Sequence, residues 1–504
     1  MLLHTRSRRL TPPAGVRRGL VAVLAVTAAL TGSALQTSPS SAESITPVII
    51  VAPAFAHPQQ RVAVVGSGFV AGETAAVTLD QQDIGSATVD GSGSFVVSFT
   101  VGADATYGEH TVEATGQTGG DVARTVLNVR NNWSQFMRAG PHQGYNPYER
   151  TLTRDNVANL STAWRFEYPS TCTSRAGPSI VNGRVYVGSS CGVLFVVDEN
   201  TGQLLWRRSL GATIDGVPAV SHHRVFVATG GRNSALYALD AETGQRLWTR
   251  SLPGTASPTS TTVRDALVYQ TSDEGNVVAV RTKNGKVRWQ RHLPGVLRST
   301  VLVTEGAAYV GSSNGYLYAL HARTGDLRWR GDTGGPILHS SPVRVGETVV
   351  IGSDTHTLVA FDRGGCGASS CSPAWHSRGL VAGSGTPTTA YGTVFAAERR
   401  TVAGSSVLDA FPAAGCGVSV CDAQWSVNLP GGRVDRGGAA AGHVVYLTTA
   451  HTRVVAVDSA TGEVLWTYQE ASDQVGSTEP VVTDGTLFLN LPGSRALLAL
   501  RPPA

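Results

Sequence analysis

The chain has 504 residues, of which 15% are charged, 58 are glycine and 24 are proline. Such a length exceeds one core of ordinary size, and such a composition suits many short strands joined by tight turns rather than helices. The formal net charge is +4, but five arginines and no acid lie in the first 42 residues, so the rest of the chain lacks the basic excess with which proteins bind nucleic acid or anionic membranes.

The first 42 residues have the pattern of an export signal. Their arginines precede an apolar run, LVAVLAVTAAL at 20–30, that is too short for a comfortable membrane span, and the small residues SSA at 40–42 suit a signal peptidase. We therefore predict that residues 1–42 are a signal peptide and that the protein is secreted to the extracellular side as a soluble monomer, without membrane insertion. The pairs Arg8-Arg9 and Arg17-Arg18 leave both general and twin-arginine export open.

Residues 43–130 predict a small β-sandwich. Apolar and polar residues alternate with the period of a strand in several short runs separated by glycine-rich turns: RVAVV (61–65), TAAVTL (74–79), SFVVSFTV (94–101) and HTVEAT (110–115). About seven such strands in roughly 85 residues are typical of two packed sheets. The stretches VVGSGFVAGETAAVTLD and GSGSFVVSFTV resemble bacterial surface immunoglobulin-like domains, which implies a spacer or an adhesive unit.

A tryptophan recurs every 40 to 50 residues through the rest of the chain. In five of these units an alanine, or Val196 in one of them, stands ten residues before the tryptophan, and Thr-Gly or Asn-Gly stands four to five residues before it. The stretches YALDAETGQRLW (237–248) and AVDSATGEVLW (456–466) share this pattern. We expect each indole to pack between neighbouring repeats, since not every repeat can be an active site. The tryptophans are Trp164, Trp206, Trp248, Trp289, Trp329, Trp375, Trp425 and Trp466.

Each unit has the pattern of four antiparallel strands. In the second unit, turn residues separate four apolar runs: GVPAV (216–220), RVFVAT (224–229), SALYALD (234–240) and RLWTRSL (246–252). A glycine between the last two runs supplies the positive φ that a tight hairpin needs. Four strands repeated about every 42 residues indicate the blades of a β-propeller.

The two ends of the repeat region complement each other. Ala499 stands at the alanine position without a following tryptophan, whereas Trp164 has no alanine-bearing strand before it. A strand at Trp164 can therefore complete the last sheet and close the ring without an exposed edge. The predicted fold is all-β: an eight-bladed β-propeller over residues 131–504, preceded by the sandwich, with 131–160 as a lead-in segment that packs on the propeller.

The alanine-to-tryptophan motif, together with the segment NPYERTLTRDNVANLSTAW (146–164), resembles the β-propellers of the pyrroloquinoline quinone (PQQ) repeat type. The resemblance covers about 131–504. This family contains quinoprotein alcohol dehydrogenases and also cofactor-free relatives, such as the lipoprotein that helps to assemble outer-membrane barrels. The motif is therefore specific for the fold and not for the chemistry.

Six cysteines, an even number, suit an exported chain with disulfides. Two repeats have fifteen rather than ten residues between alanine and tryptophan, and each extension carries Cys-Gly-x-Ser-x-Cys. We predict that Cys366–Cys371 and Cys416–Cys421 are local disulfides that clip two hairpin tips. A zinc site suits them less well because no histidine accompanies either pair. Cys172–Cys191 is then the third pair by exclusion, and a hairpin turn at 182–183 brings these two cysteines near each other.

Several short motifs of catalytic or metal sites occur, but turns explain them. GSSCG (188–192) and GSSNG (311–315) match the hydrolase pattern G-x-S-x-G, yet that motif needs a strand–turn–helix, and both lie at the same place in different repeats. His222-His223 and the acids of TSDEGN (271–276), which could hold calcium, also fall in predicted turns. We therefore expect no metal site among them.

Position within the repeat selects the candidate ligand-binding residues. The first strand of each blade lines the central channel, so the residues just before it surround one mouth, where converging polar groups would hold a ligand or cofactor. A solvated funnel without a ligand is the plainer alternative. The residues at this position are Arg175, Asp215, Ser257, Arg298, His339, Ser384, Asp435, Arg436 and Ser477.

The resemblance implies that a quinoprotein dehydrogenase would hold PQQ against a disulfide between adjacent cysteines and a tryptophan, with calcium on Glu and Asn and an Asp as base. The chain has no adjacent cysteines, every tryptophan but Trp133 belongs to the repeat motif, and no C-x-x-C-H could attach a haem. Asp215 or Asp435 could be the base, but the other groups cannot be placed.

We therefore expect a secreted, non-catalytic binding protein without cofactor or metal, whose partner is a protein or a carbohydrate and not nucleic acid. The alternative is an atypical PQQ- and calcium-dependent dehydrogenase that oxidises alcohols or sugars. A hydrolase or lyase activity in the same funnel is a third possibility.

Overall fold

The computed structural model describes residues 46–504 apart from 139, 170, 256–258, 355–357, 379–384, 400–405, 435, 451–452, 470–477, 494 and 504. The predicted signal peptide at 1–42 lies outside the described residues. The described chain is all-β, and beside its strands it has one short 3-10 turn, η1 (Val157–Asn159). Among these residues, no helix has the length and apolar character that crossing a bilayer demands.

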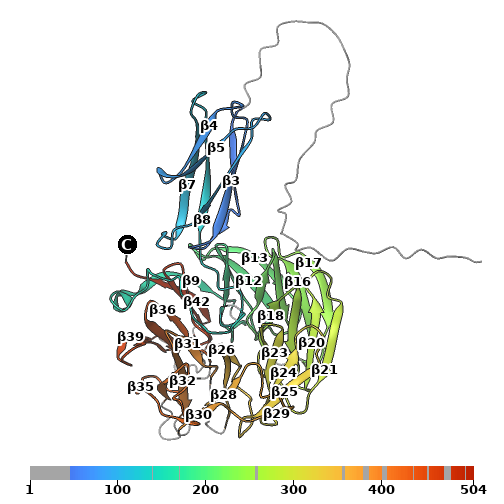
Figure 1. The fold of residues 1–504 in the computed structure, drawn as a ribbon. Helices are drawn as coiled ribbons and strands as arrows, with labels where there is room; N and C mark the ends of the chain where they lie inside the picture. The colour runs from blue at the N-terminus through green and yellow to red at the C-terminus, as the bar shows by residue number, and fades with distance from the viewer. Residues whose placement is uncertain are drawn as a thin grey trace, which may run out of the picture. The chain divides into compact units, whose positions relative to one another are not determined.

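The N-terminal β region consists of two sheets that share one apolar core. Residues of β3 are alternately exposed and buried, because successive side chains of a strand point to opposite faces. Val62 and Val64 of this strand meet Phe95 and Leu127 in the core. The strands predicted in this region are confirmed. One sheet contains β1 (Val48–Ala52), β3 (Arg61–Ser67) and β6 (Phe95–Thr100), and the other β2 (Phe55–Ala56), β8 (Val122–Val129), β7 (Gly108–Gly116), β4 (Thr74–Leu79) and β5 (Gln82–Thr88) (Figure 1).

Eight further sheets, each with a core of four antiparallel strands, follow in the described part of the chain. We number them 1 to 8. The first four are β10 (Ser179–Val181), β11 (Arg184–Val187), β12 (Val193–Asp198) and β13 (Leu204–Ser209) in sheet 1; β14 (Ala219–Ser221), β15 (Arg224–Ala228), β16 (Ala235–Asp240) and β17 (Arg246–Ser251) in sheet 2; β18 (Thr262–Arg264), β19 (Leu267–Thr271), β20 (Asn276–Arg281) and β21 (Val287–His292) in sheet 3; and β22 (Leu302–Thr304), β23 (Ala307–Gly311), β24 (Tyr316–His321) and β25 (Leu327–Asp332) in sheet 4.

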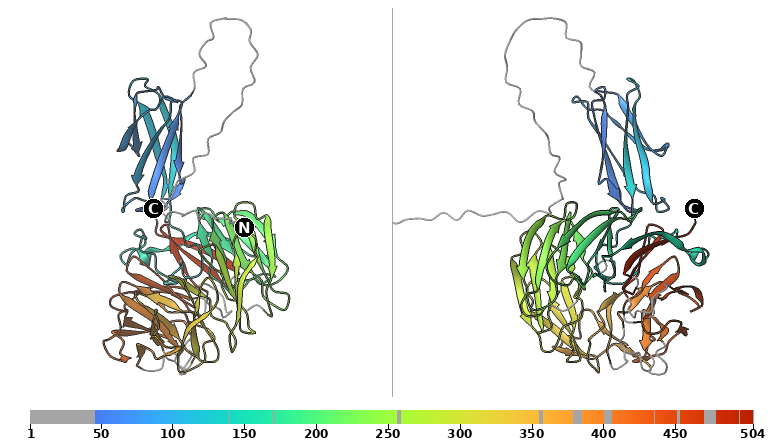
Figure 2. Two further views of the ribbon diagram at one scale, coloured as in Figure 1. Left: turned by 45° about the vertical axis from the view of Figure 1, so that its right-hand side comes forward. Right: turned by 180° about the vertical axis from the view of Figure 1, so that it is seen from behind.

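The remaining four sheets repeat the same order. They are β26 (Val343–Val345), β27 (Thr348–Gly352), β28 (Leu358–Asp362) and β30 (Trp375–Ser377) in sheet 5; β31 (Thr388–Ala390), β32 (Thr393–Arg399), β33 (Ser406–Pro412) and β35 (Trp425–Leu429) in sheet 6; β36 (Ala439–Ala441), β37 (Val444–Thr448), β38 (Arg453–Asp458) and β39 (Val464–Gln469) in sheet 7; and β40 (Val481–Thr483), β41 (Thr486–Leu491), β42 (Ala496–Arg501) and β9 (Ser161–Glu167) in sheet 8. The first strands of consecutive sheets are neighbours, and the sheets follow one another in chain order (Figures 1 and 2). This arrangement is consistent with a PQQ-type propeller.

Sheet 8 joins the two ends of the repeat region, as the sequence predicts. Strand β9 pairs antiparallel with β42 (Figure 1), and Trp164 lies opposite Ala499. The first strand of sheet 2 differs from the prediction of 216–220, because β14 begins only at Ala219. Pro218 has no N–H for a ladder, and the Val217 N–H donates instead to the Ser260 hydroxyl, 3.0 Å away in the segment before β18.

Each repeat tryptophan faces an alanine of its own sheet, or Val196 in the case of Trp206, and, up to Trp425, covers a glycine of the next one. Trp248 pairs with Ala238, and a Cβ on Gly285 would lie 2.6 Å from its ring. The Trp248 indole N–H also donates to the Thr282 carbonyl at 2.9 Å. Since Gly285 has a φ of +65°, both its conformation and its lack of a side chain are required. The other pairs are Trp164 with Gly202, Trp206 with Gly244, Trp289 with Gly325, Trp329 with Gly365, Trp375 with Gly415 and Trp425 with Gly462.

The two long hairpins form cystine fingers that reach the preceding sheet. Strand β29 (Ser370–Cys371) pairs parallel with β25 of sheet 4, and β34 (Val420–Cys421) pairs parallel with β30 of sheet 5. Disulfides join Cys366 to Cys371 and Cys416 to Cys421. A third disulfide joins Cys172 to Cys191. The three pairs are those that the sequence predicts, whereas the added parallel strands are not predicted.

Candidate functional site

The predicted channel mouth contains charged residues that already have partners. The Arg298 Nε lies 3.2 Å from an oxygen of Asp273, the His339 Nδ1 lies 3.4 Å from Asp354, and an Arg436 nitrogen lies 3.7 Å from Glu479. Arg175 is exposed. The other candidates, Ser257, Ser384, Asp435 and Ser477, lie outside the described residues.

Asp215 and Glu479 are two further carboxylates at this mouth, beside the half-buried Asp273 and Asp354. Asp215 is half-buried, and its Oδ1 is buried without a hydrogen-bond partner. Glu479 is buried and accepts the Gly177 N–H at 2.9 Å, which ties sheet 8 to the segment before sheet 1. The position pattern selects Ser477 instead of Glu479, so sequence analysis misses it. A signal existed in Glu479-Pro480, which precedes its strand as Gly177-Pro178 precedes β10.

Buried hydroxyls connect neighbouring sheets where the first strands begin. Ser260 accepts the Val217 N–H, Thr300 accepts the Ser260 N–H, and Ser341 accepts the Thr300 N–H, at 3.0, 3.2 and 2.9 Å. Thr386 accepts the Ser341 N–H at 3.1 Å. These hydroxyls satisfy backbone donors that would otherwise be buried without partners. They therefore have a structural task, which gives no support to a serine nucleophile at this level of the channel.

The lead-in segment runs along the first strands from sheet to sheet. Trp133 exchanges two backbone hydrogen bonds with Ile180 of sheet 1, at 2.8 and 2.9 Å. The Ser134 carbonyl then accepts the Val220 N–H of sheet 2 at 2.7 Å. In sheet 3, the Val263 N–H donates to the side chain of Gln135 at 2.9 Å.

The same segment continues past the remaining sheets in order. The site of a Cβ on Gly140 lies 3.6 Å from the Val303 carbonyl of sheet 4. Further along, the segment binds the first strands of sheets 5 to 8: Arg344 N–H donates to Pro141 O at 2.9 Å, Thr389 N–H to Gln143 O at 2.8 Å, Ala440 N–H to Gly144 O at 2.7 Å, and the Asn146 side chain to Val482 O at 3.0 Å. The described residues of 133–146 thus form hydrogen bonds with the first strands of seven of the described sheets and pass close to that of sheet 4.

The turn within this segment fills space between the first strands. Phe136 and Met137 form an apolar cluster with Ala176 and Val217, which lie just before β10 and β14. His142 is fully buried, with its ring 5.5 Å from that of Phe136 in an edge-on contact. Burial lowers the pKa of His142 to about 3, so the imidazole is neutral near pH 7. The segment is therefore packed against the first strands, with both apolar and polar side chains buried, rather than a loose connection.

The described residues do not fit a quinone cofactor of the dehydrogenase kind. Trp133 is only 2% exposed and packs within the apolar cluster of sheets 7, 8 and 1, so it presents no open ring face for stacking. The disulfides join cysteines 19, 5 and 5 residues apart, not adjacent ones. In the part of the chain that the structure describes, no group of three or more His, Cys, Asp or Glu side chains could hold a metal ion.

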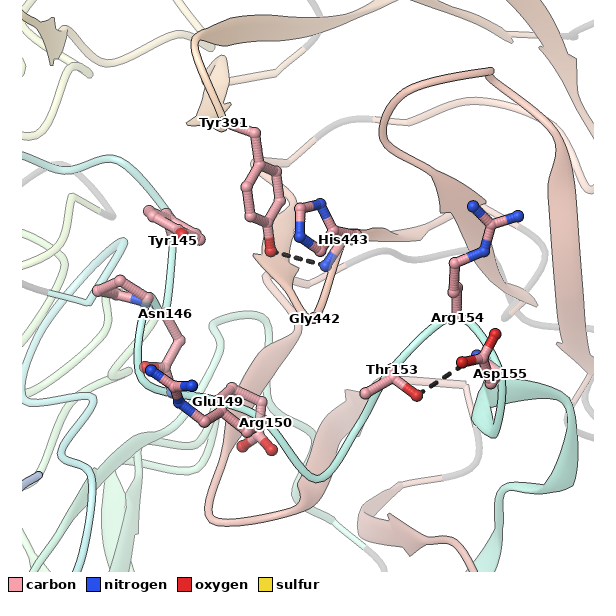
Figure 3. Close-up of a pocket in the computed structure, with 11 residues that line it drawn as sticks. Tyr145, Asn146, Glu149, Arg150, Thr153, Arg154, Asp155, Tyr391, Gly442 and His443 are labelled. Atoms are coloured by element: carbon pink, nitrogen blue, oxygen red, sulfur yellow. Dashed lines mark hydrogen bonds between the residues drawn. The ribbon is translucent and has the colours of Figure 1, made fainter. Parts of the chain in front are cut away.

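A pocket of about 440 Å³ lies where the lead-in segment passes the turns of sheets 6 and 7. We call it the Tyr391 pocket, and Figure 3 shows its lining. The Tyr391 and His443 rings are stacked with their centres 4.3 Å apart, and the Tyr391 hydroxyl accepts the His443 backbone N–H at 2.7 Å. The lining residues are Tyr145, Asn146, Pro147, Glu149, Arg150, Thr153, Arg154, Asp155, Tyr391, Gly442 and His443.

The charged groups of the Tyr391 pocket differ in how firmly they are held. Glu149 is buried and accepts three backbone N–H groups, and burial raises the pKa of its carboxyl. An Arg154 nitrogen lies 3.1 Å from Asp458. Arg150 and Asp155 are exposed. No sequence motif marks the Tyr391 pocket, because the residues that line it come from the lead-in segment and from two turns far apart in the chain.

Comparison with known proteins identifies relatives of the repeat region. A PQQ-type family model, described as outer membrane protein assembly factor BamB, matches residues 149–300, 293–409 and 421–500. Among solved structures, BamB from Moraxella catarrhalis is 16% identical and covers 68% of this chain and 98% of its own, with a TM-score of 0.53. The quinohemoprotein alcohol dehydrogenase from Comamonas testosteroni is 16% identical and covers 74% of this chain and 82% of its own, with a TM-score of 0.58. These likenesses concern the fold.

A curated relative is the dehydrogenase subunit of a quinone-type alcohol dehydrogenase from Komagataeibacter europaeus. It is 31% identical over 75 residues, which are 15% of this chain and 10% of that protein. The chain thus spans about a tenth of the length of the curated relatives that it matches. So short a match supports a shared repeat and gives no evidence for a shared activity.

Proposed function

The chain belongs to the PQQ-type repeat family described as outer membrane protein assembly factor BamB, and from this premise we propose that it is a secreted, non-catalytic binding protein. In this proposal its eight sheets are the blades of a closed propeller docked by tryptophans, and the N-terminal β region is an immunoglobulin-like sandwich that acts as a spacer. The partner is a protein or a carbohydrate on the extracellular side. The protein acts without PQQ and without calcium.

The lead-in segment is the observation that carries this proposal. Residues 133–146 follow the first strands of all eight described sheets, and Phe136 and Met137 fill space just behind the mouth. A planar quinone needs an open face on which to stack and groups that bind its charges. Here the channel-lining backbone and its hydroxyls are already used for packing, and binding partners would meet the outer surfaces instead.

One observation favours the alternative, an atypical PQQ- and calcium-dependent dehydrogenase for alcohols or sugars. The Asp215 Oδ1 is buried without a hydrogen-bond partner at the mouth, which suits a base that bonds only to its substrate. The other groups expected of such an enzyme do not accompany it. If this alternative holds, Asp215→Asn abolishes turnover without changing the thermal midpoint of unfolding.

The experiment is a titration of the purified protein with PQQ and calcium, followed by absorbance and calorimetry, and then a dye-linked oxidation assay with alcohols and sugars. We expect neither binding nor turnover. Tight PQQ binding with turnover that Asp215→Asn removes would overturn the proposal. Secretion is tested separately: protein recovered from the culture medium is expected to begin at Glu43.

A further inference from the structure

The Tyr391 pocket combines an aromatic wall with groups of both charges. We propose that it binds an acidic sugar, a hydroxylated ring that bears one carboxylate. This inference rests on the proposed binding function and names a ligand class for it. The volume of the pocket, about 440 Å³, falls within the range of small-molecule sites, which are roughly 300–1,000 Å³.

The aromatic wall includes Tyr391, a residue type that the equivalent turns of the other sheets lack, whereas His443 matches His223 of sheet 2. Tyr391 and His443 follow the first strands of sheets 6 and 7 and have positive φ angles of 52° and 64°. Small or acidic residues, or histidines in sheet 2, occupy the equivalent turns elsewhere: Asn182-Gly183, His222-His223, Asp265-Ala266, Glu305-Gly306 and Asp484-Gly485. Because such residues make the same turn, turn geometry does not require a tyrosine there.

The rings of this wall are fixed before any ligand binds. Tyr391 stacks on His443 at an angle of 17°, and Tyr145 meets Tyr391 edge-on with ring centres 4.9 Å apart. The Tyr391 hydroxyl is held by the His443 backbone N–H (Figure 3). A preformed aromatic surface offers apolar contact to the C–H face of a sugar ring at a low entropic cost.

The lead-in segment supplies the groups for the polar substituents. Arg150 is exposed and, within the described part of the chain, makes no ion pair. A guanidinium binds a carboxylate with two parallel hydrogen bonds. Asp155 is exposed on the same segment, and its N–H donates to the Thr153 hydroxyl at 3.3 Å (Figure 3). Its carboxylate can accept hydrogen bonds from sugar hydroxyls.

The mixture of charges decides between ligand classes. A simple anion such as phosphate would gain from Arg150 but has no C–H face to pack on the aromatic wall. A neutral sugar would use Asp155 and the aromatic wall but would leave the Arg150 guanidinium without a counterion. An acidic sugar, free or at the end of a polysaccharide, uses all three features.

The experiment is calorimetric titration of the full protein with glucuronate, glucose, acetate and a short oligomer of glucuronate. We expect glucuronate to bind with a Kd of about 1 mM or tighter, and glucose and acetate to bind at least roughly tenfold more weakly. If the oligomer binds more tightly than glucuronate, the site is assigned to the end of a polysaccharide. If the two bind equally, the site is assigned to the free sugar. Glucuronate binding no tighter than that of both glucose and acetate would overturn the proposal.

Substitutions at two positions separate the contributions of the guanidinium and of the aromatic wall. Arg150→Gln is expected to weaken glucuronate binding about tenfold or more and to leave glucose unchanged. Tyr391→Leu is expected to weaken the binding of both sugars. If Tyr391→Leu lowers stability, Tyr391→Phe, which keeps the ring, serves in its place and should largely retain the binding. Arg207→Gln, a change of an exposed arginine on β13, is the matched control and should change nothing. Undiminished glucuronate binding by Arg150→Gln would contradict the assignment. If none of these sugars binds, the acidic-sugar assignment fails, but the proposal that the protein acts without PQQ is not affected.

Discussion

Sheets 1 to 3 and sheets 4 and 5 attach to their next neighbours in two different ways. Trp206, Trp248 and Trp289 donate their indole N–H to a turn carbonyl of the following sheet, at 3.2, 2.9 and 2.8 Å. The Trp329 and Trp375 indole N–H groups are buried without a hydrogen-bond partner. In these two sheets the following hairpin is a cystine finger that adds a parallel strand instead.

The strand register accounts for this difference in sheet 5 but not in sheet 4, whose tryptophan pairing has the same shift as those of sheets 1 to 3. In sheets 1 to 4 a register shift lies directly beside the pairing of the tryptophan, as between Ala238 and Leu239 in sheet 2. The pairing of β28 with β30 and of β33 with β35 has no such shift. A β-bulge re-aims the side chain next to it. Sheets with the same repeat motif can thus be joined either by an indole hydrogen bond or by the parallel strand that a cystine finger adds to the outer edge of the preceding sheet.

Removal of an indole tests whether both kinds of contact depend on the ring. Trp289→Ala is expected to lower the free energy of unfolding by about 3–5 kcal/mol, because it leaves a cavity and removes one hydrogen bond. Trp329→Ala should cost a similar amount, since that ring is only 2% exposed. Denaturant unfolding followed by circular dichroism measures both. A cost below about 1 kcal/mol for either would mean that the indole does not hold the sheets together.

A side chain on the covered glycine tests the fit of the ring. Gly285→Ala is expected to cost about 2–4 kcal/mol, because it adds a contact with Trp248 to the strain of a left-handed residue. Gly183→Ala is the control: Gly183 has a φ of +77°, but no heavy atom lies within 4 Å of its added Cβ. It should cost about 1–2 kcal/mol. Equal costs in thermal unfolding would show that the ring yields to the methyl group.

Opening one cystine finger tests the brace. The double change Cys366→Ser and Cys371→Ser is expected to cost about 2 kcal/mol, since the disulfide closes a short loop. Amide exchange should accelerate at Arg330, whose N–H donates to the Ser369 carbonyl at 3.0 Å. Thermal unfolding under non-reducing conditions gives the cost. Unchanged exchange at Arg330 would show that the parallel strand holds without its disulfide.

The smallest effect distinguishes the two kinds of indole. Trp289→Phe removes a hydrogen bond, whereas Trp329→Phe removes a buried N–H that has no partner. We expect Trp329→Phe to be milder by about 1 kcal/mol. Denaturant midpoints compare the two variants. The reverse order would refute the distinction between the two contacts.

The parts of the fold that depend on repeated side chains could be predicted from the sequence. Each repeat must place the same ring on the same glycine, so the tryptophan spacing marks the sheets, and Ala499 marks the strand that Trp164 completes. The cysteine spacing likewise gives the three disulfides. The pairing of β29 with β25 uses backbone groups, which leave no pattern in the side chains.

The candidate site was much less predictable. The course of residues 133–146 depends mainly on backbone carbonyls such as those of Ser134 and Gln143, so only its buried Trp133 gives a hint. The Tyr391 pocket joins residues more than 200 positions apart, and no short motif records such a meeting. The position of a residue relative to the repeat tryptophan did select the residues at the mouth, but it does not show whether each charged side chain already has an ion-pair partner.

The course of the lead-in segment has a mechanical consequence. Because its hydrogen bonds to seven of the eight described sheets follow one another along the chain, tension applied at its N-terminal end loads the Trp133 contacts with sheet 1 before those farther along. The segment then peels away stepwise, with a low peak force and a long extension, instead of rupturing at once. Single-molecule pulling from the N-terminus would record this as a staircase that precedes unfolding of the ring.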